Sequence, residues 1–163
     1  MSLMRSMSDY QRRTKARGLL QSLLAKHQAC IGNDVAPKST AMQLIDSCWQ
    51  RNQHAFAGRL ANTEGVLAGV RQPKPRYQII AVLALSEAVD AVHREMADSP
   101  FFFTLLFALR ELLQGTAKEI GRGLIPGGIE EHILRWGIGI YQKAVAQPEV
   151  QARYPALTLP LDR

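Results

Sequence analysis

The chain has little cysteine and no long apolar run. Cys30 and Cys48 are its only cysteines, too few for the disulfide framework that stabilises small secreted proteins. Its longest charge-free apolar runs cover about ten residues, half of what a membrane-spanning helix needs. The first residues also lack the apolar stretch of a signal peptide. These absences argue against secreted and membrane-spanning classes, and we expect a cytoplasmic protein without a transmembrane segment.

Internal repeats, low-complexity tracts and long linkers are absent as well. The 163 residues suit one domain, and hydrophobic residues make up 47% of them, enough for a core. We therefore predict a single helical domain over residues 1–163. We expect residues 1–8 to be disordered or vector-derived. Residues 148–163 contain several prolines and should form an extended, irregular tail that lies over the domain.

Apolar spacing predicts an all-α fold, a bundle of about five to seven helices. A first helix should begin near Ser8. The segment RQPKPRY before residue 78 should be a stiff, extended connector because proline disfavours helix in the preceding residue. The clearest helix is predicted over residues 78–97, where apolar side chains recur with the 3, 4, 3, 4 spacing of a packed seam. Those side chains are Val82, Leu85, Val89, Val92 and Met96.

A strongly apolar helix is predicted to begin at Pro100, a residue that suits the first helical position. Its first two turns are apolar nearly all round, which favours a central place in the fold. The alternative is that Phe103 and Phe107, which point away from the main apolar face, form a self-association surface. Residues 129–145 fit both helix and strand spacing. We expect a helix, because nothing else in the chain offers a strand partner, with Gly137 and Gly139 allowing close packing.

Recognisable catalytic and metal-binding motifs are also missing. His27 and Cys30 share a helix face, and Asp90 and His93 have the spacing of half a carboxylate-bridged metal site, but neither pair has a second pair to complete it. We therefore assign no catalytic, cofactor-binding or metal-binding residue, and the sequence favours a non-enzymatic role. The alternative is a ligand-binding protein or enzyme with a buried pocket. Its lining would be His93, Trp136 and Tyr141.

Positive charge is concentrated in two short segments. Residues 1–30 contain six Lys or Arg against one Asp, whereas the part after residue 76 contains eight bases and ten acids. Such an asymmetry can orient a partner. The candidate contacts for nucleic acid or an acidic partner are Arg12, Arg13, Lys15, Arg17, Arg71, Lys74 and Arg76.

Three functions remain open from these patterns. The leading one is a non-enzymatic accessory or interaction protein. It would associate with itself, as a homodimer or larger homo-oligomer, or bind another protein. The second is a nucleic-acid-binding accessory factor, which predicts that the two basic clusters converge on one face. The third is the helical protein with a buried pocket. The sequence resembles no family that would decide among them.

Overall fold

The computed structural model describes residues 2–31, 43, 46–47, 73–92, 100–122 and 129–161, and the structural statements below concern these residues. They form α1 (Ser2–Ile31), α3 (Pro73–Val92), α4 (Pro100–Gly121), α5 (Ile129–Val145), α6 (Pro148–Arg153) and the short 3₁₀ helix η1 (Pro155–Thr158). No strand occurs among them. The predicted all-α class is therefore confirmed for the part of the chain that is described.

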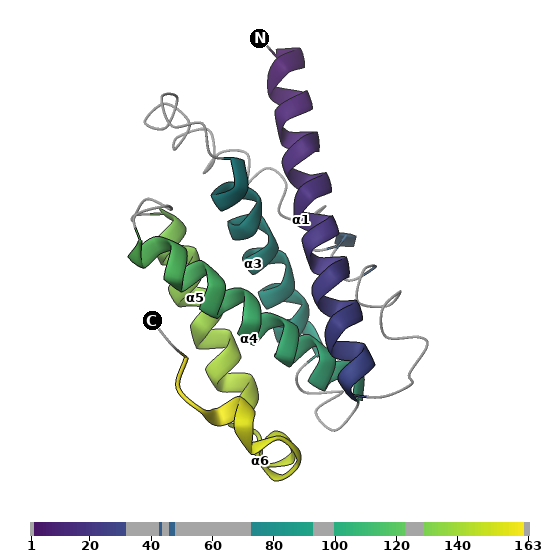
Figure 1. The fold of residues 1–163 in the computed structure, drawn as a ribbon, viewed down its shortest axis with the longest axis vertical. Helices are drawn as coiled ribbons and strands as arrows, with labels where there is room; N and C mark the ends of the chain where they lie inside the picture. Colours follow the sequence, from purple (N-terminus) through teal and green to yellow (C-terminus); the bar gives the residue numbers. More distant parts are fainter. Residues whose placement is uncertain are drawn as a thin grey trace.

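The helices pack as a bundle with α3 and α4 at its centre (Figure 1). Helix α3 contacts α1, α4 and α5, while α4 contacts α1, α3, α5 and η1. Helices α1 and α3 lie side by side and run in the same direction, and α1 extends past the start of α3 (Figure 1). The first turns of α1 thus project beyond the other described helices (Figure 1).

Two predicted helix starts were wrong. Helix α1 begins at Ser2, so Ser8 lies inside it, and residues 2–8, expected to be disordered or vector-derived, are helical. Helix α3 begins at Pro73, so residues 73–77 of RQPKPRY are helix and not extended connector. Pro73 and Pro75 fall in the first turn, where the backbone N–H groups have no intrahelical partner and proline costs little.

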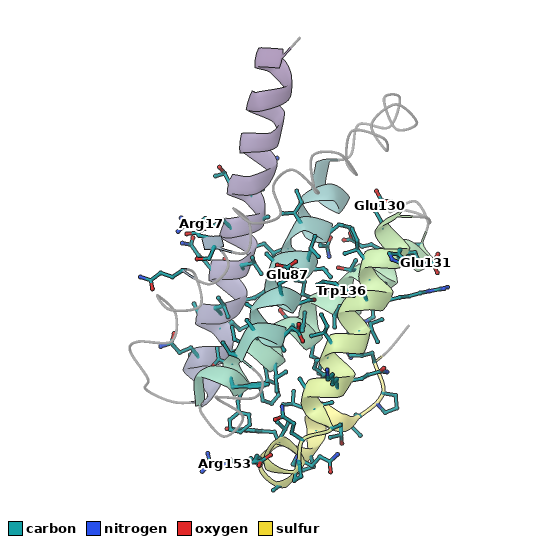
Figure 2. The ribbon with its side chains drawn as sticks, turned by 180° about the vertical axis from the view of Figure 1, so that it is seen from behind. Arg17, Glu87, Glu130, Glu131, Trp136 and Arg153 are labelled. Carbon is teal, nitrogen blue, oxygen red and sulfur yellow. The ribbon has the colours of Figure 1, made fainter. Side chains whose placement is uncertain are left out.

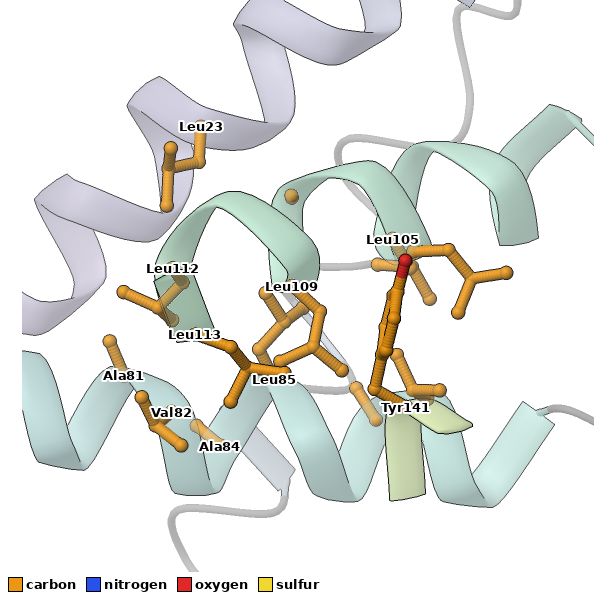
Figure 3. Close-up of a cluster of buried hydrophobic side chains, with 14 of the residues drawn as sticks. Leu23, Ala81, Val82, Ala84, Leu85, Leu105, Leu109, Leu112, Leu113 and Tyr141 are labelled. Carbon is orange, nitrogen blue, oxygen red and sulfur yellow. The ribbon is translucent and has the colours of Figure 1, made fainter. Parts of the chain in front are cut away.

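Helix α4 is enclosed, as its apolar sequence predicts. Phe102, Phe103, Leu105, Leu106 and Leu109 are all fully buried, and each would forgo about 1.5–3 kcal/mol of burial in water. The seam of α3 is confirmed from residue 82 to residue 92; Met96 lies outside the described residues. Leucines of α4 meet small residues of α3, Leu23 of α1 and Tyr141 of α5 in one core (Figure 3).

Helix α5 spans residues 129–145, which confirms helix over strand. It approaches α3 closely at Gly137. A Cβ atom there would lie 2.9 Å from Ser86 Oγ and 3.1 Å from both Val82 Cγ1 and Leu113 Cδ2. Close packing is therefore confirmed at Gly137. At Gly139 the prediction was wrong, because no atom of the described residues lies within 4 Å of its Cβ position.

The C-terminal segment is ordered, and the prediction of an extended tail was wrong. Pro148 takes the first turn of α6 and Pro155 the first turn of η1, positions where proline is tolerated. The segment does cover the domain: Val150 and Leu157 are fully buried, and Tyr154 packs against the core. We call residues 148–161 the C-terminal strap.

Candidate functional site

The basic residues of the first cluster lie on α1. Ala16 is the first buried residue along the described side chains of α1. Arg12 and Arg13 precede it by four and three residues, so they sit one turn earlier on the same face of the helix; their side chains lie outside the described part. Lys15 is exposed. The first cluster thus lies directly before and beside the first described buried residue of α1.

The second cluster lies at the start of α3. Lys74 and Arg76 belong to its first turns, with side chains outside the described part, and Arg71 lies outside the described residues. Because α1 and α3 pack side by side in the same direction, the start of α3 lies beside the first half of α1 (Figure 1). The fold therefore brings the two sequence segments that carry the basic clusters to one end of the bundle. We call this the basic end.

Arg17 marks the edge of the basic end and is already paired. Its Nε donates to Asp46 Oδ1 at 3.0 Å and its Nη2 to Asp46 Oδ2 at 2.9 Å. The two side chains are 45% and 35% exposed, and ion pairs near the surface contribute about 0.2–1 kcal/mol. The pair therefore holds Asp46 against α1 only weakly.

The surface predicted for self-association is covered by the chain itself. Phe103 is 1% exposed, and the Tyr154 ring of the strap meets it edge-on at 4.8 Å between centroids. Tyr154 also meets Phe107 edge-on at 5.2 Å. His27 of α1 stacks on Phe107, with 5.9 Å between the ring centroids. This corrects the prediction that Phe103 forms a self-association surface. Its side chain is not exposed to a second copy, because the Tyr154 ring of the strap covers it.

Helix α1 and helix α4 meet in a charged group beside this aromatic cluster. Lys26 Nζ donates to Glu111 Oε1, and His27 Nε2 lies 3.6 Å from the same oxygen. Burial lowers the pKa of His27, and the nearby Lys26 charge adds to this, while Glu111 opposes it. The imidazole therefore favours its neutral form, in which it stacks on Phe107 without burying a charge.

The predicted pocket does not form around Trp136 and Tyr141. These residues are five positions apart on α5, about 140° around the helix. Tyr141 is buried against α4 and the strap, whereas Trp136 is 38% exposed on the outer side. His93 lies outside the described residues. The two described side chains of the proposed lining thus point to different sides of α5, which is a correction to the pocket prediction.

Sequence reasoning missed the polar clamp that holds the strap. Arg110 Nη1 donates to Tyr141 Oη at 2.9 Å and to the carbonyl oxygens of Leu157 and Leu159 at 3.2 and 2.8 Å. Arg110 Nη2 donates to Pro160 O at 3.3 Å, and Tyr141 Oη donates to Leu157 O. Burial raises the pKa of Tyr141, although Arg110 partly opposes this. An arginine inside an apolar helix is the one sequence signal that points to such a clamp.

No group of three His, Cys, Asp or Glu side chains among the described residues could hold a metal ion. None of the described helices is long and apolar enough to cross a membrane. No family model, no curated protein and no solved structure matches the chain.

Proposed function

We propose that this protein is a non-enzymatic helical accessory protein that binds duplex nucleic acid through its basic end. The observation that carries the proposal is the parallel packing of α1 and α3, which joins two basic segments about sixty residues apart in the sequence. Six of the seven candidate residues lie on these two helices: Arg12, Arg13, Lys15, Arg17, Lys74 and Arg76.

Helix geometry adds to the positive charge. The N-termini of α1 and α3 point toward the same end (Figure 1), and each helix N-terminus carries a partial positive charge that favours anions. The projecting first turns of α1 give a rod that can follow a phosphate backbone. Such contacts position a protein on a duplex without reading its sequence, so we expect sequence-independent binding in the cytoplasm.

Fluorescence anisotropy with a labelled duplex tests the proposal. Wild-type protein should bind with a dissociation constant of roughly 10⁻⁴–10⁻⁶ M at low salt, and the binding should be lost by about 200 mM salt because it depends on counterion release. Arg13→Glu and Arg76→Glu should each weaken it.

Arg153→Glu provides the matched control. Arg153 is exposed and lies at the opposite end of the bundle (Figure 2), so this variant changes the net charge equally without touching the basic end. An absence of binding at about 50 mM salt would refute the proposal. Binding to an acidic polypeptide but not to the duplex would instead favour an acidic protein partner.

A further inference from the structure

The C-terminal strap is a folded unit with its own backbone hydrogen bonds. Tyr154 N donates to Val150 O at 2.8 Å, Leu157 N to Tyr154 O at 3.0 Å, and Leu159 N to Ala156 O at 3.3 Å. Within the described part of the chain, the backbone–backbone bonds of the strap stay within residues 147–159. Its helical shape therefore does not depend on the backbone of the bundle beneath it.

The bundle holds the strap through the backbone oxygens of the strap. Arg110 of α4 donates to the carbonyl oxygens of Leu157, Leu159 and Pro160, and Tyr141 Oη of α5 donates to Leu157 O. Each of these bonds ends on a main-chain atom and not on a side chain of the strap. The polar part of the contact therefore recognises the path of a docked segment.

Apolar contacts recognise the side chains of that segment. Val150 and Leu157 are fully buried, and the Tyr154 ring lies edge-on against Phe103 and Phe107. Polar and aromatic contacts thus come from one patch of α4 and α5 under the strap. We call this patch the strap site; its residues are Phe103, Phe107, Arg110 and Tyr141.

A short hinge joins the strap to the bundle. Helix α5 ends at Val145 and α6 begins at Pro148, so only Ala146 and Gln147 lie between them. Gln147 is extended, with φ −66° and ψ 136°, because proline disfavours the helical conformation in the residue before it. A self-contained element on a short hinge is the arrangement in which identical copies exchange that element.

We propose that the strap site accepts the strap of a second copy, so that two molecules associate by exchanging straps. An identical segment makes the same hydrogen bonds and ring contacts in the second molecule, and no further surface is needed. Phe103 stays covered, under Tyr154 of the second copy instead of its own. The hinge keeps the chain's own strap at a high local concentration, so exchange increases with protein concentration or when a molecule's own strap is weakened.

The basic end takes no part in this association. Its residues lie on α1 and at the start of α3, whereas the strap site lies on α4 and α5. Strap exchange and nucleic-acid binding therefore succeed or fail separately.

A labelled peptide of residues 148–161 tests whether the strap acts as a ligand. Fluorescence anisotropy follows its binding to full-length protein up to about 1 mM. Leu157→Asn in the protein weakens docking of its own strap, because it puts an amide at a fully buried position. This variant should bind the peptide at least about 10-fold more tightly than wild type, whose own strap occupies the site.

Arg110→Glu is the matched variant of the strap site and should lose peptide binding, because a carboxylate then faces the carbonyl oxygens. Circular dichroism checks that each variant is folded, and Tyr154→Ala, a milder change at a partly buried residue, replaces Leu157→Asn if that variant unfolds. Absence of peptide binding to the folded strap variant would overturn the proposal. Equal binding by Arg110→Glu would overturn it as well.

Mixing the two variants tests exchange between copies. Arg110→Glu keeps an intact strap, and Leu157→Asn keeps an intact strap site. In sedimentation velocity up to about 1 mM, each variant alone should be monomeric and the mixture should form a heterodimer. A mixture of Arg110→Glu with wild type should associate at least about 10-fold more weakly, because the wild-type site is occupied. A monomeric mixture of the two variants would overturn exchange between copies, and peptide binding would then leave the site to a segment of another protein.

Discussion

The aromatic side chains of α4 and α5 sit in contrasting surroundings. Phe103 and Phe107 of α4 are covered by Tyr154 of the strap and by His27 of α1. Trp136 of α5 has no such cover and is 38% exposed. All three residues lie in similar apolar helix patterns. Their exposure differs because side chains from α1 and the strap cover Phe103 and Phe107 but leave Trp136 partly exposed. The covered aromatic side chains contribute burial to stability, whereas Trp136 contributes less because part of its ring stays in solvent.

Removal of a sealed aromatic side chain should have the largest effect. Phe103→Ala should lower the free energy of unfolding by about 3–5 kcal/mol, because it removes a buried ring and leaves a cavity under Tyr154. Trp136→Ala should change it by no more than about 0.5 kcal/mol in dilute monomer, as expected for an exposed position. Urea unfolding followed by circular dichroism measures both. Equal losses would show that the two aromatic sites are not different in kind.

Two glycines on α5 give a second, smaller contrast. Gly137→Ala should destabilise the protein by about 1–3 kcal/mol, because the new Cβ would overpack against Ser86, Val82 and Leu113. Gly139→Ala should stabilise the monomer by about 1 kcal/mol, because alanine favours helix and meets nothing. Thermal melts at low protein concentration compare them. If the two variants shift the melting temperature in the same direction, the contrast between inner and outer faces is wrong.

The clamp on the strap should contribute less than the core beneath it. Tyr141→Phe removes the hydroxyl that accepts from Arg110 and donates to Leu157 O, and it should cost about 1 kcal/mol of unfolding free energy. Thr158→Val removes an exposed hydrogen bond to Pro155 O and provides the control, with an expected change below about 0.5 kcal/mol. Chemical denaturation of both variants should reproduce this order; a larger loss from Thr158→Val would contradict it.

The smallest expected effect is a pH dependence at the α1–α4 contact. Burial lowers the pKa of His27 in the folded state, so the unfolded chain takes up its proton first as the pH falls. Stability should be fully present above the unfolded pKa of about 6.5 and should decrease below it. His27→Gln should flatten the unfolding free energy between about pH 7 and 5. An unchanged slope in that variant would assign the effect to other groups.

Local patterns predicted the interior better than the surface. The apolar turns after Pro100 predicted an enclosed α4, and the 3, 4 spacing of α3 predicted a buried seam, because burial follows directly from helical periodicity. Gly137 was predicted for close packing by the same reasoning. These features depend on one helix at a time and on the hydrophobic effect, which acts without regard to partner identity.

Features that depend on a second segment were missed or misread. Pro73 and Pro155 were taken as helix breakers, although each stands in a first turn, where proline is tolerated. The cover of Phe103 and the clamp at Arg110 both require the strap to return to α4, which no local spacing encodes. At the basic end, the sequence supplied the charges, but only the packing of α1 against α3 places their segments together.

The salt dependence of duplex binding by wild type, Arg13→Glu, Arg76→Glu and the double variant tests the central claim most directly. If the basic clusters of α1 and α3 act as one surface, each single variant should reduce the slope of log affinity against log salt by about one unit and the double variant by about two. Arg153→Glu should leave the slope unchanged. A slope that responds to Arg13→Glu but not to Arg76→Glu would contradict the claim that the two helices form one binding surface.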